Sequence, residues 1–230
     1  MPEIKAVFFD LDGTLLDRNA SLVKFINDQY ERYIKELYLV DKQHFMNRFI
    51  ELDCRGYVWK DRVYSQLLQE MNITELTWEQ LLEDYLINFK NACMPFRNVQ
   101  KVLETLSQMG IILGLISNGK RKFQRENLNA LGIASYFDTI LISDEVGLRK
   151  PDPLIFQMGL DNLSVSAEES IFVGDHPEND IKAAREAGML GIWKHDDYWM
   201  DAEADFTIND LYEIAAIVQS LKGAEINERF

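Results

Sequence analysis

The chain has 230 residues, 47% of them hydrophobic, and a formal net charge of -14. These values predict a folded protein with a substantial core, and the excess of carboxylates argues against binding a nucleic-acid polymer, which requires a basic surface. The N-terminus lacks the pattern of a secretory signal, and no apolar run approaches the roughly 20 residues that span a membrane. We therefore expect a cytoplasmic protein without membrane contact.

The first predicted element is a short buried strand. Residues 6–9 (AVFF) form a continuous apolar run, which is typical of a strand covered on both faces. Asp10 and Asp12 follow it directly. Two carboxylates this close at the rim of a core repel each other and lose hydration, so the pair indicates a specific use for the charges.

The segment from residue 19 to about 92 predicts four amphipathic helices. Apolar residues recur at spacings of three and four within residues 21–37, 45–52, 63–71 and 81–89. Thr77 and Gln80 form a capping box at the start of the last helix. Four such helices in succession resemble a small bundle.

Beyond Pro95, strands and helices alternate. Strands are expected at residues 111–117, 139–143, 170–175, 191–193 and 206–208, with helices between them. This alternation predicts an α/β fold with a Rossmann-like parallel sheet and helices on both faces. The helical block is then an insertion, so we expect a core domain made of residues 1–16 and 93–230 and a helical domain made of residues 17–92.

Polar side chains follow four of the predicted strands. In chain order these are Asp10, Asp12 and Thr14, then Ser117 and Asn118, then Lys150, and finally Asp175 and Asp180. Because ligands bind beyond the carboxyl ends of parallel strands, we expect these groups to gather at one edge of the sheet. Carboxylates so close together need more countercharge than one lysine supplies, and an oxygen-rich site without His or Cys suits Mg²⁺. A carboxylate beside Mg²⁺ can attack phosphorus and form an aspartyl-phosphate.

The order of these motifs resembles a known family. With h for an apolar residue, hhhDxDGT, hhhSNG, KPDP and hhhGDxxxxD follow one another between residues 6 and 180 and resemble the four motifs of the haloacid dehalogenase superfamily. The resemblance implies that the helical insertion is a C1-type cap. Residues 136–156 are similar to the 5′-nucleotidase and phosphoglycolate phosphatase-like branches. The implied activity is Mg²⁺-dependent hydrolysis of a small phosphorylated metabolite, with a nucleoside monophosphate favoured.

The resemblance also implies catalytic roles at the first strand and at Lys150. Asp10 would be the nucleophile. Asp12 would protonate the leaving oxygen and then deprotonate the hydrolytic water, and Thr14 would help to fix the Asp12 loop. Lys150 would neutralise charge between Asp10 and the phosphate.

The remaining roles concern the phosphate, the metal and the substrate. Ser117 and the backbone N–H of Asn118 would hold the phosphoryl oxygens. Asp175 would complete the Mg²⁺ site formed by Asp10 and the Asp12 backbone carbonyl, with Asp180 supporting it. Arg55, in the insertion segment 53–62, is a candidate contact for a second anionic group of the substrate.

Several alternatives stay open at this point. A haloacid dehalogenase of the same superfamily is disfavoured by Asp12, because displacing a halide needs no acid there. A sugar-phosphate mutase also uses the second aspartate. A phosphonate hydrolase would need a lysine from the insertion, for which Lys60 is a candidate. A non-enzymatic phospho-receiver-like module shares the acidic pocket and lysine, but lacks an inserted cap and a DxDGT loop.

Overall fold

The computed structural model describes residues 3–227, with side chains up to Lys222. It divides the chain into two compact units, one made of Met1–Leu16 with Pro95–Phe230 and the other of Asp17–Met94. The sequence placed the second boundary between residues 92 and 93, whereas the helical unit itself ends at Met94.

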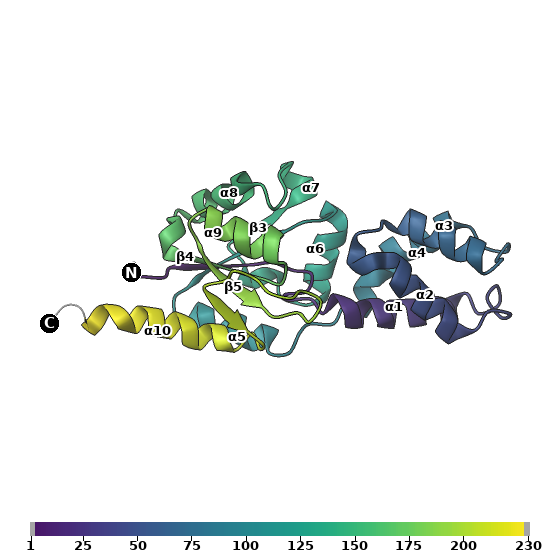
Figure 1. Ribbon diagram of the computed structural model, residues 1–230, viewed down its shortest axis with the longest axis horizontal. Helices are drawn as coiled ribbons and strands as arrows, with labels where there is room; N and C mark the ends of the chain where they lie inside the picture. The colour runs from purple at the N-terminus through teal and green to yellow at the C-terminus, as the bar shows by residue number, and fades with distance from the viewer. Residues whose placement is uncertain (1–2, 228–230) are drawn as a thin grey trace. The chain divides into compact units, whose positions relative to one another are not determined.

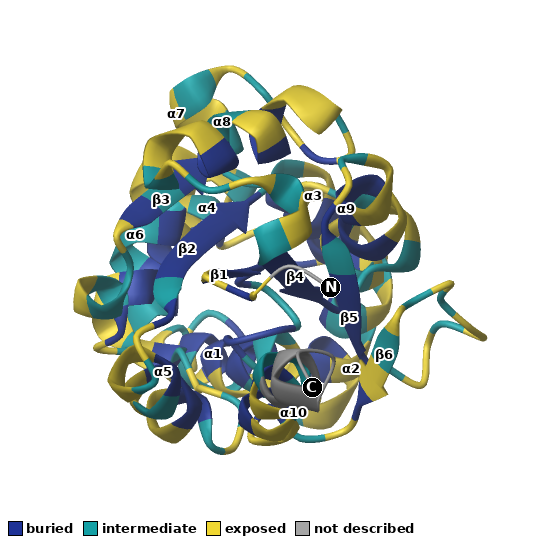
Figure 2. Ribbon diagram, turned by 90° about the vertical axis from the view of Figure 1, so that its left-hand side faces the viewer, coloured by how far each residue is buried: buried dark blue, intermediate teal, exposed yellow. Residues whose placement is uncertain are grey.

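A six-stranded parallel sheet forms the centre of the first unit, in the order β3-β2-β1-β4-β5-β6. The strands are β1 (Ala6–Phe9), β2 (Ile112–Ser117), β3 (Thr139–Ile142), β4 (Ser170–Gly174), β5 (Leu190–Lys194) and β6 (Phe206–Ile208). β1 lies between β2 and β4, and Phe9 is opposite both Leu115 and Val173. All four residues of β1 and all five of β4 are buried, as the dark blue strands in Figure 2 show. The predicted Rossmann-like fold is confirmed.

Helices cover both faces of this sheet. They are α5 (Val99–Gln108), α6 (Arg121–Ala130), α7 (Ser143–Val146), α8 (Pro153–Leu163), α9 (Ala183–Glu186) and α10 (Glu213–Asn227), and a single π-helical turn, η5 (Pro177–Lys182), precedes α9. α8 and α9 lie on one face, and α5 and α10 lie on the other (Figure 1). Phe156 of α8 packs edge-on against Phe172 of β4, with ring centroids 5.1 Å apart, so apolar side chains join helix and sheet.

The second unit is the predicted set of four helices. These are α1 (Arg18–Arg32), α2 (Lys42–Asp53), α3 (Lys60–Glu70) and α4 (Trp78–Asn88). The capping box of Thr77 and Gln80 is present at the start of α4, as predicted. α1 ends at Arg32, before the end expected at residue 37. The apolar spacing continues past the helix because Leu37 is buried in a turn, where the Tyr30 hydroxyl donates to the carbonyl oxygens of Leu37 and Val40 at 3.3 and 2.6 Å.

A buried polar network lies inside the helical unit. The Tyr64 hydroxyl donates to Gln29 Oε1 at 2.8 Å, and Gln29 Nε2 donates to Asp84 Oδ2 at 2.9 Å. Arg32 Nε donates to the other Asp84 oxygen at 2.8 Å, and Asn88 Nδ2 does so at 2.9 Å. Asp84 is therefore a buried carboxylate held by three side chains of α1 and α4, with the Tyr64 hydroxyl of α3 bound to one of them, Gln29.

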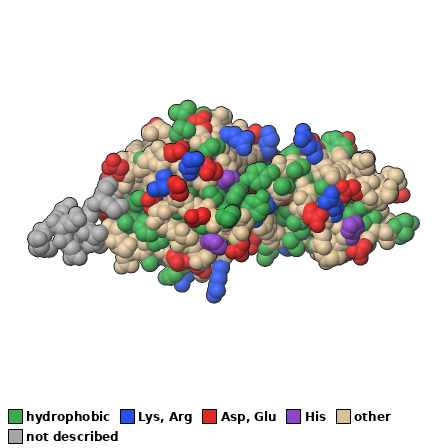
Figure 3. All heavy atoms as spheres, viewed as in Figure 1, with side chains coloured by type: hydrophobic (Ala, Val, Ile, Leu, Met, Phe, Trp, Pro, Cys, Tyr) green, Lys and Arg blue, Asp and Glu red, His purple; other side chains and the backbone are tan. Residues whose placement is uncertain are grey.

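Charged side chains of both signs are interspersed on the face drawn in Figure 3. Among the described residues, the structure contains no helix with the length and apolar character that crossing a bilayer requires.

Candidate active site

Asp10, Lys150 and Asp180 form a buried ionic cluster at the carboxyl end of β1. The Asp10 backbone N–H donates to the carbonyl oxygen of Val173 on β4 at 2.9 Å, which extends the ladder by one residue. Lys150 Nζ donates to Asp10 Oδ1 and to Asp180 Oδ1, both at 2.6 Å. The exposed fractions of the three residues are 6%, 2% and 2% in the order Asp10, Lys150, Asp180.

Asp175 brings a third carboxylate to this cluster from the end of β4. One carboxylate oxygen each of Asp10, Asp175 and Asp180 lie within 4.8 Å of one another. The backbone carbonyl oxygen of Asp175 accepts a hydrogen bond from the indole Nε1 of Trp193 on β5 at 2.8 Å. Trp193 was not predicted as a site residue, although it stands at the end of the strand expected at residues 191–193.

Two glycines allow the carboxylates to come this close. Gly13 has φ +90°, and a Cβ there would lie 2.4 Å from Asp175 Oδ2. A Cβ on Gly174 would lie 2.4 Å from the Cβ of Asp180. Real Cβ atoms do not approach other atoms so closely, so the glycines of the first and last motifs make room for the acidic groups.

The β2 end connects the other site residues through side-chain amides. Asn118 Nδ2 donates to the Lys150 carbonyl oxygen at 2.8 Å, and the Lys150 backbone N–H donates to Asn118 Oδ1 at 2.9 Å. The buried Ser117 hydroxyl oxygen accepts from Gln124 Nε2 of α6 at 3.0 Å. The same amide donates to Asp12 Oδ2. Gln124 was not predicted from the sequence, where it is one unremarked polar residue in a helix.

Burial raises the pKa of two of the acids. Burial raises the pKa of Asp10 to about 7, an effect that Lys150 opposes and Asp180 reinforces. Burial also raises the pKa of Asp175 well above its ordinary value, and the Asp180 and Asp10 charges add to this. Burial alone would lower the pKa of Lys150, but Asp10 and Asp180 together raise it above its ordinary value. The Lys150 ammonium therefore stays charged, but its one positive charge does not balance the negative charges of the carboxylates around it.

The donor set fits a metal ion. Three carboxylates face one ammonium, so the cluster carries an excess of negative charge when all its groups are ionised. A cation held between Asp10, Asp175 and Asp180 would stabilise the ionised acids in their buried positions. The Asp12 carboxylate is not one of the clustered ligands, because it points to Gln124.

The role of Thr14 in fixing the Asp12 loop stays a prediction. Thr14 is fully buried, and its hydroxyl oxygen has no hydrogen-bond partner among the described residues. Backbone hydrogen bonds close the loop after Asp12, since the N–H groups of Leu15 and Leu16 donate to the Leu11 carbonyl oxygen at 2.9 and 2.8 Å.

Arg55 and Lys60 belong to the helical unit. Arg55 lies in the turn Cys54–Gly56 with φ 57°, and Cys54 before it is also left-handed, at φ 47°. Its role as a substrate contact stays a prediction. Lys60 is buried and ion-paired with Asp53, which also accepts from Arg18 at 2.8 Å. This pairing disfavours Lys60 as the Schiff-base lysine of a phosphonate hydrolase.

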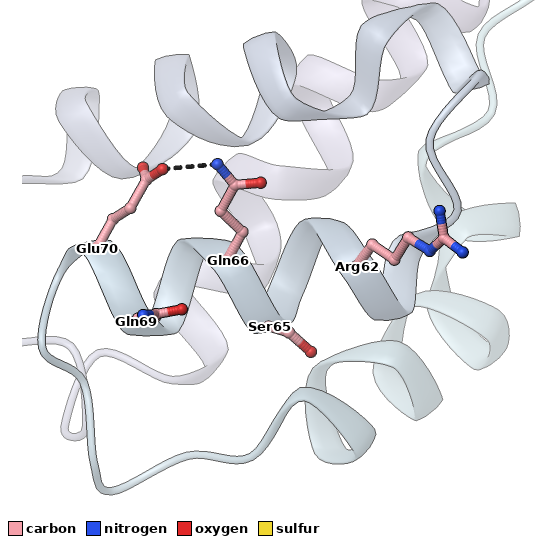
Figure 4. A pocket seen from close by; sticks show the side chains of 5 residues that line it. All are labelled: Arg62, Ser65, Gln66, Gln69 and Glu70. Carbon is pink, nitrogen blue, oxygen red and sulfur yellow. Dashed lines mark hydrogen bonds between the residues drawn. The ribbon is translucent and has the colours of Figure 1, made fainter.

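The helical unit has a shallow hollow along α3. Arg62, Ser65, Gln66, Gln69 and Glu70 line it (Figure 4). Its acidic group is already satisfied, because Glu70 accepts from Gln66 at 2.8 Å and from Arg48 at 2.6 and 2.8 Å. The hydrogen bonds from Arg48 lower the pKa of Glu70 to about 2. The carboxylate that lines the hollow is therefore already paired.

Comparisons with known proteins agree with the geometry. A family model of haloacid dehalogenase-like hydrolases matches residues 7–193. A glyceraldehyde 3-phosphate phosphatase of Methanocaldococcus jannaschii is 40% identical over 95% of this chain and 99% of its own. The structure of a HAD phosphatase from Thermococcus onnurineus is 28% identical, with a TM-score of 0.67 over 94% of this chain and 98% of its own. The HAD-hydrolase YfnB of Bacillus subtilis, solved with magnesium, shares the fold with a TM-score of 0.75 at 21% identity, over 94% of this chain and 99% of its own.

Proposed function

The chain belongs to the haloacid dehalogenase-like hydrolases, and we propose that it is a Mg²⁺-dependent phosphatase that hydrolyses a small phosphomonoester through an aspartyl-phosphate on Asp10. The observation that carries this proposal is the buried cluster in which Lys150 bridges Asp10 and Asp180, with the Asp175 carboxylate beside them. Carboxylate oxygens in this number suit Mg²⁺, which shares its coordination with substrate phosphate.

In the first step, Asp10 attacks phosphorus and the ester P–O bond breaks. Asp12 gives its proton to the leaving oxygen, so the product alcohol departs neutral. Lys150 holds Asp10 in place through one of its oxygens and supplies positive charge near the phosphoryl group. The Ser117 hydroxyl and the Asn118 N–H hold the phosphoryl oxygens.

In the second step, water attacks the aspartyl-phosphate. Asp12, now a carboxylate, takes a proton from the water, the acyl phosphate bond breaks, and Asp10 is regenerated with release of inorganic phosphate. Bound Mg²⁺ would offset the negative charges of Asp10, Asp175 and the phosphate in both steps. Asp180 keeps Lys150 in position from its other side.

The second aspartate favours ester hydrolysis over displacement of a halide. Asp12 is half-buried, and its carboxylate is hydrogen-bonded by Gln124 at the site. A leaving alkoxide needs a proton, whereas a halide does not. This placement supports the phosphatase reading over the dehalogenase alternative.

For the substrate, we infer that a triose phosphate is the first candidate. The relative named for glyceraldehyde 3-phosphate is similar over 95% of this chain, a span that includes the helical insertion. We propose that this insertion acts as the cap that selects the substrate. A nucleoside monophosphate is the second candidate, because Tyr57 and Trp59 in the segment 53–62 are exposed aromatic side chains of a kind that stacks on bases.

The test is phosphate release by the purified protein, with and without Mg²⁺, on glyceraldehyde 3-phosphate, nucleoside monophosphates and phosphoglycolate. We expect Mg²⁺-dependent release, and kcat/KM at least about tenfold higher for the triose phosphate. The Asp10→Asn protein, assayed in parallel, measures spontaneous loss of phosphate. Full activity after exhaustive chelation would contradict the metal site, and a preference for nucleotides would select the second candidate.

A further inference from the structure

Gln124 is a buried amide that contacts three groups of the candidate site at once. It lies on α6 and is 2% exposed. Its Nε2 donates to Asp12 Oδ2, to the Ser117 hydroxyl oxygen at 3.0 Å and to the Asn118 carbonyl oxygen at 3.2 Å. These contacts join the loop after β1 to the end of β2, two segments that are far apart in the chain.

The orientation of the amide follows from its partners. The Asn118 carbonyl oxygen can only accept, so the group facing it must be the NH₂ end of the amide. The opposite end, Oε1, accepts from Asn127 Nδ2 at 3.3 Å. The amide is therefore held from both sides, with its donors directed at the site.

The backbone at the β2 end is also shaped around this side chain. A Cβ on Gly119 would lie 2.8 Å from both Cγ and Nε2 of Gln124. Only glycine leaves room for the amide at this point. Gly119 thus leaves the space in which the Gln124 side chain reaches Asp12.

We infer that Gln124 is a positioning residue that aims Asp12 at the leaving group, an inference that rests on the proposed phosphatase function. Asp12 Oδ2 accepts a hydrogen bond from the amide, so the proton that Asp12 delivers is carried by its other oxygen, Oδ1. The same amide fixes Ser117, so the proton donor and a phosphoryl-binding hydroxyl are held in one frame. A general acid that can rotate out of line loses most of its effect.

The consequence is a dependence on the leaving group. An alkyl phosphate needs protonation of its leaving oxygen, whereas p-nitrophenolate leaves readily without it. Removing the Gln124 donors should therefore slow phosphoryl transfer from the alkyl ester much more than from the aryl ester. A residue that merely packed the helix against the sheet would affect both substrates alike.

The experiment compares Gln124→Met, which keeps the size and removes the donors, with Gln124→Glu, which keeps the shape and can still accept from Asn127. The matched control is Gln157→Met, an exposed glutamine on α8. Single-turnover rates and KM are measured in Mg²⁺ with glycerol 3-phosphate and with p-nitrophenyl phosphate, and melting temperatures establish that each variant is folded.

We expect both Gln124 variants to lose about 10- to 100-fold in the rate on the alkyl ester, with KM changed less than about twofold, and to lose far less on the aryl ester. Equal losses on the two esters, or none, would overturn the role of Gln124 while leaving the phosphatase function standing. A wild-type protein inactive on both esters, and on the triose phosphate, nucleotide and phosphoglycolate substrates named above, would overturn the proposed function and this inference with it. If Gln124→Met fails to fold, Gln124→Glu alone decides between these outcomes.

Discussion

Asp10 is both the proposed nucleophile and the charge partner of Lys150. Asp10→Asn keeps the size of the side chain, but an amide cannot attack phosphorus. We expect phosphate release to fall by at least about 10⁴-fold, with an unchanged circular dichroism spectrum. The measurement is a steady-state assay combined with acid quenching to detect phosphorylated protein, which should form in the wild type only. Retention of more than a few per cent of the wild-type rate would indicate direct attack by water.

The same substitution also tests how burial of the Asp10 carboxylate affects the stability of the protein. Burial raises the pKa of Asp10 from 3.8 to about 7, so the folded protein binds a proton at Asp10 more tightly than the unfolded chain does. With metal chelated, the wild type should lose stability as the pH rises from about 4 towards 7, and Asp10→Asn should lose less over that interval. Urea unfolding at several pH values in EDTA measures this. Parallel pH profiles for the two proteins would contradict the assigned cause.

Loss of the Asp175 carboxylate should weaken Mg²⁺ binding without removing the nucleophile. We expect Mg²⁺ to raise the melting temperature of the wild type, since a ligand at 100 times its Kd adds about 2.7 kcal/mol to the free energy of unfolding. Asp175→Asn should need a much higher Mg²⁺ concentration for the same shift. Asp161→Asn, a substitution at an exposed position on α8, is the control. Identical Mg²⁺ titrations for all three proteins would place the ion elsewhere.

At the scale of an element, the loop after β1 depends on Gly13. Gly13→Ala introduces a Cβ 2.4 Å from Asp175 Oδ2, in addition to the strain of φ +90°. Gly132 has φ +69° and no atom within 4 Å of a built Cβ, so Gly132→Ala measures the backbone strain alone, about 1–2 kcal/mol. We expect Gly13→Ala to lose Mg²⁺ binding as well as stability, by thermal shift with and without the ion. Mg²⁺ binding equal to that of Gly132→Ala would contradict the proposed crowding.

Sequence patterns predicted the elements better than the contacts between them. Continuous apolar runs marked the buried strands, and the alternation of strand and helix predicted the parallel sheet, because both signals are local. The family and its hydrolase chemistry followed from motifs at strand ends, and both are confirmed. The contacts of Gln124 and Trp193 arise from strand order and helix placement, which no local pattern records. The same limit explains why α1 was predicted too long: Leu37 is buried by a turn and not by a helix.

At the scale of the whole molecule, the two compact units have separate cores. Asp84→Ala removes the acceptor of Gln29, Arg32 and Asn88 in the helical unit. We expect the free energy of unfolding of that unit to fall by about 2 kcal/mol, a value reduced from that of a fully buried ion pair because Arg32 is partly exposed. Glu83→Ala, an exposed neighbour on α4, is the control.

Hydrogen exchange followed by mass spectrometry locates this effect. Amides of α1 and α4 should exchange faster in Asp84→Ala, whereas those of β1 and β4 should keep their wild-type rates. Equal acceleration in the strands would show that the two units unfold as one cooperative body.

The central position of β1 has a consequence for folding during synthesis. The strand leaves the ribosome well before its two neighbours in the sheet, which begin at Ile112 and Ser170. At 5–20 residues per second, roughly 10 to 30 seconds pass before β4 emerges. During that interval the helical insertion, whose residues all precede β2 in the chain, can complete its own core. The nascent chain therefore carries an apolar strand ahead of a folded bundle, and we expect it to depend on chaperones at this stage.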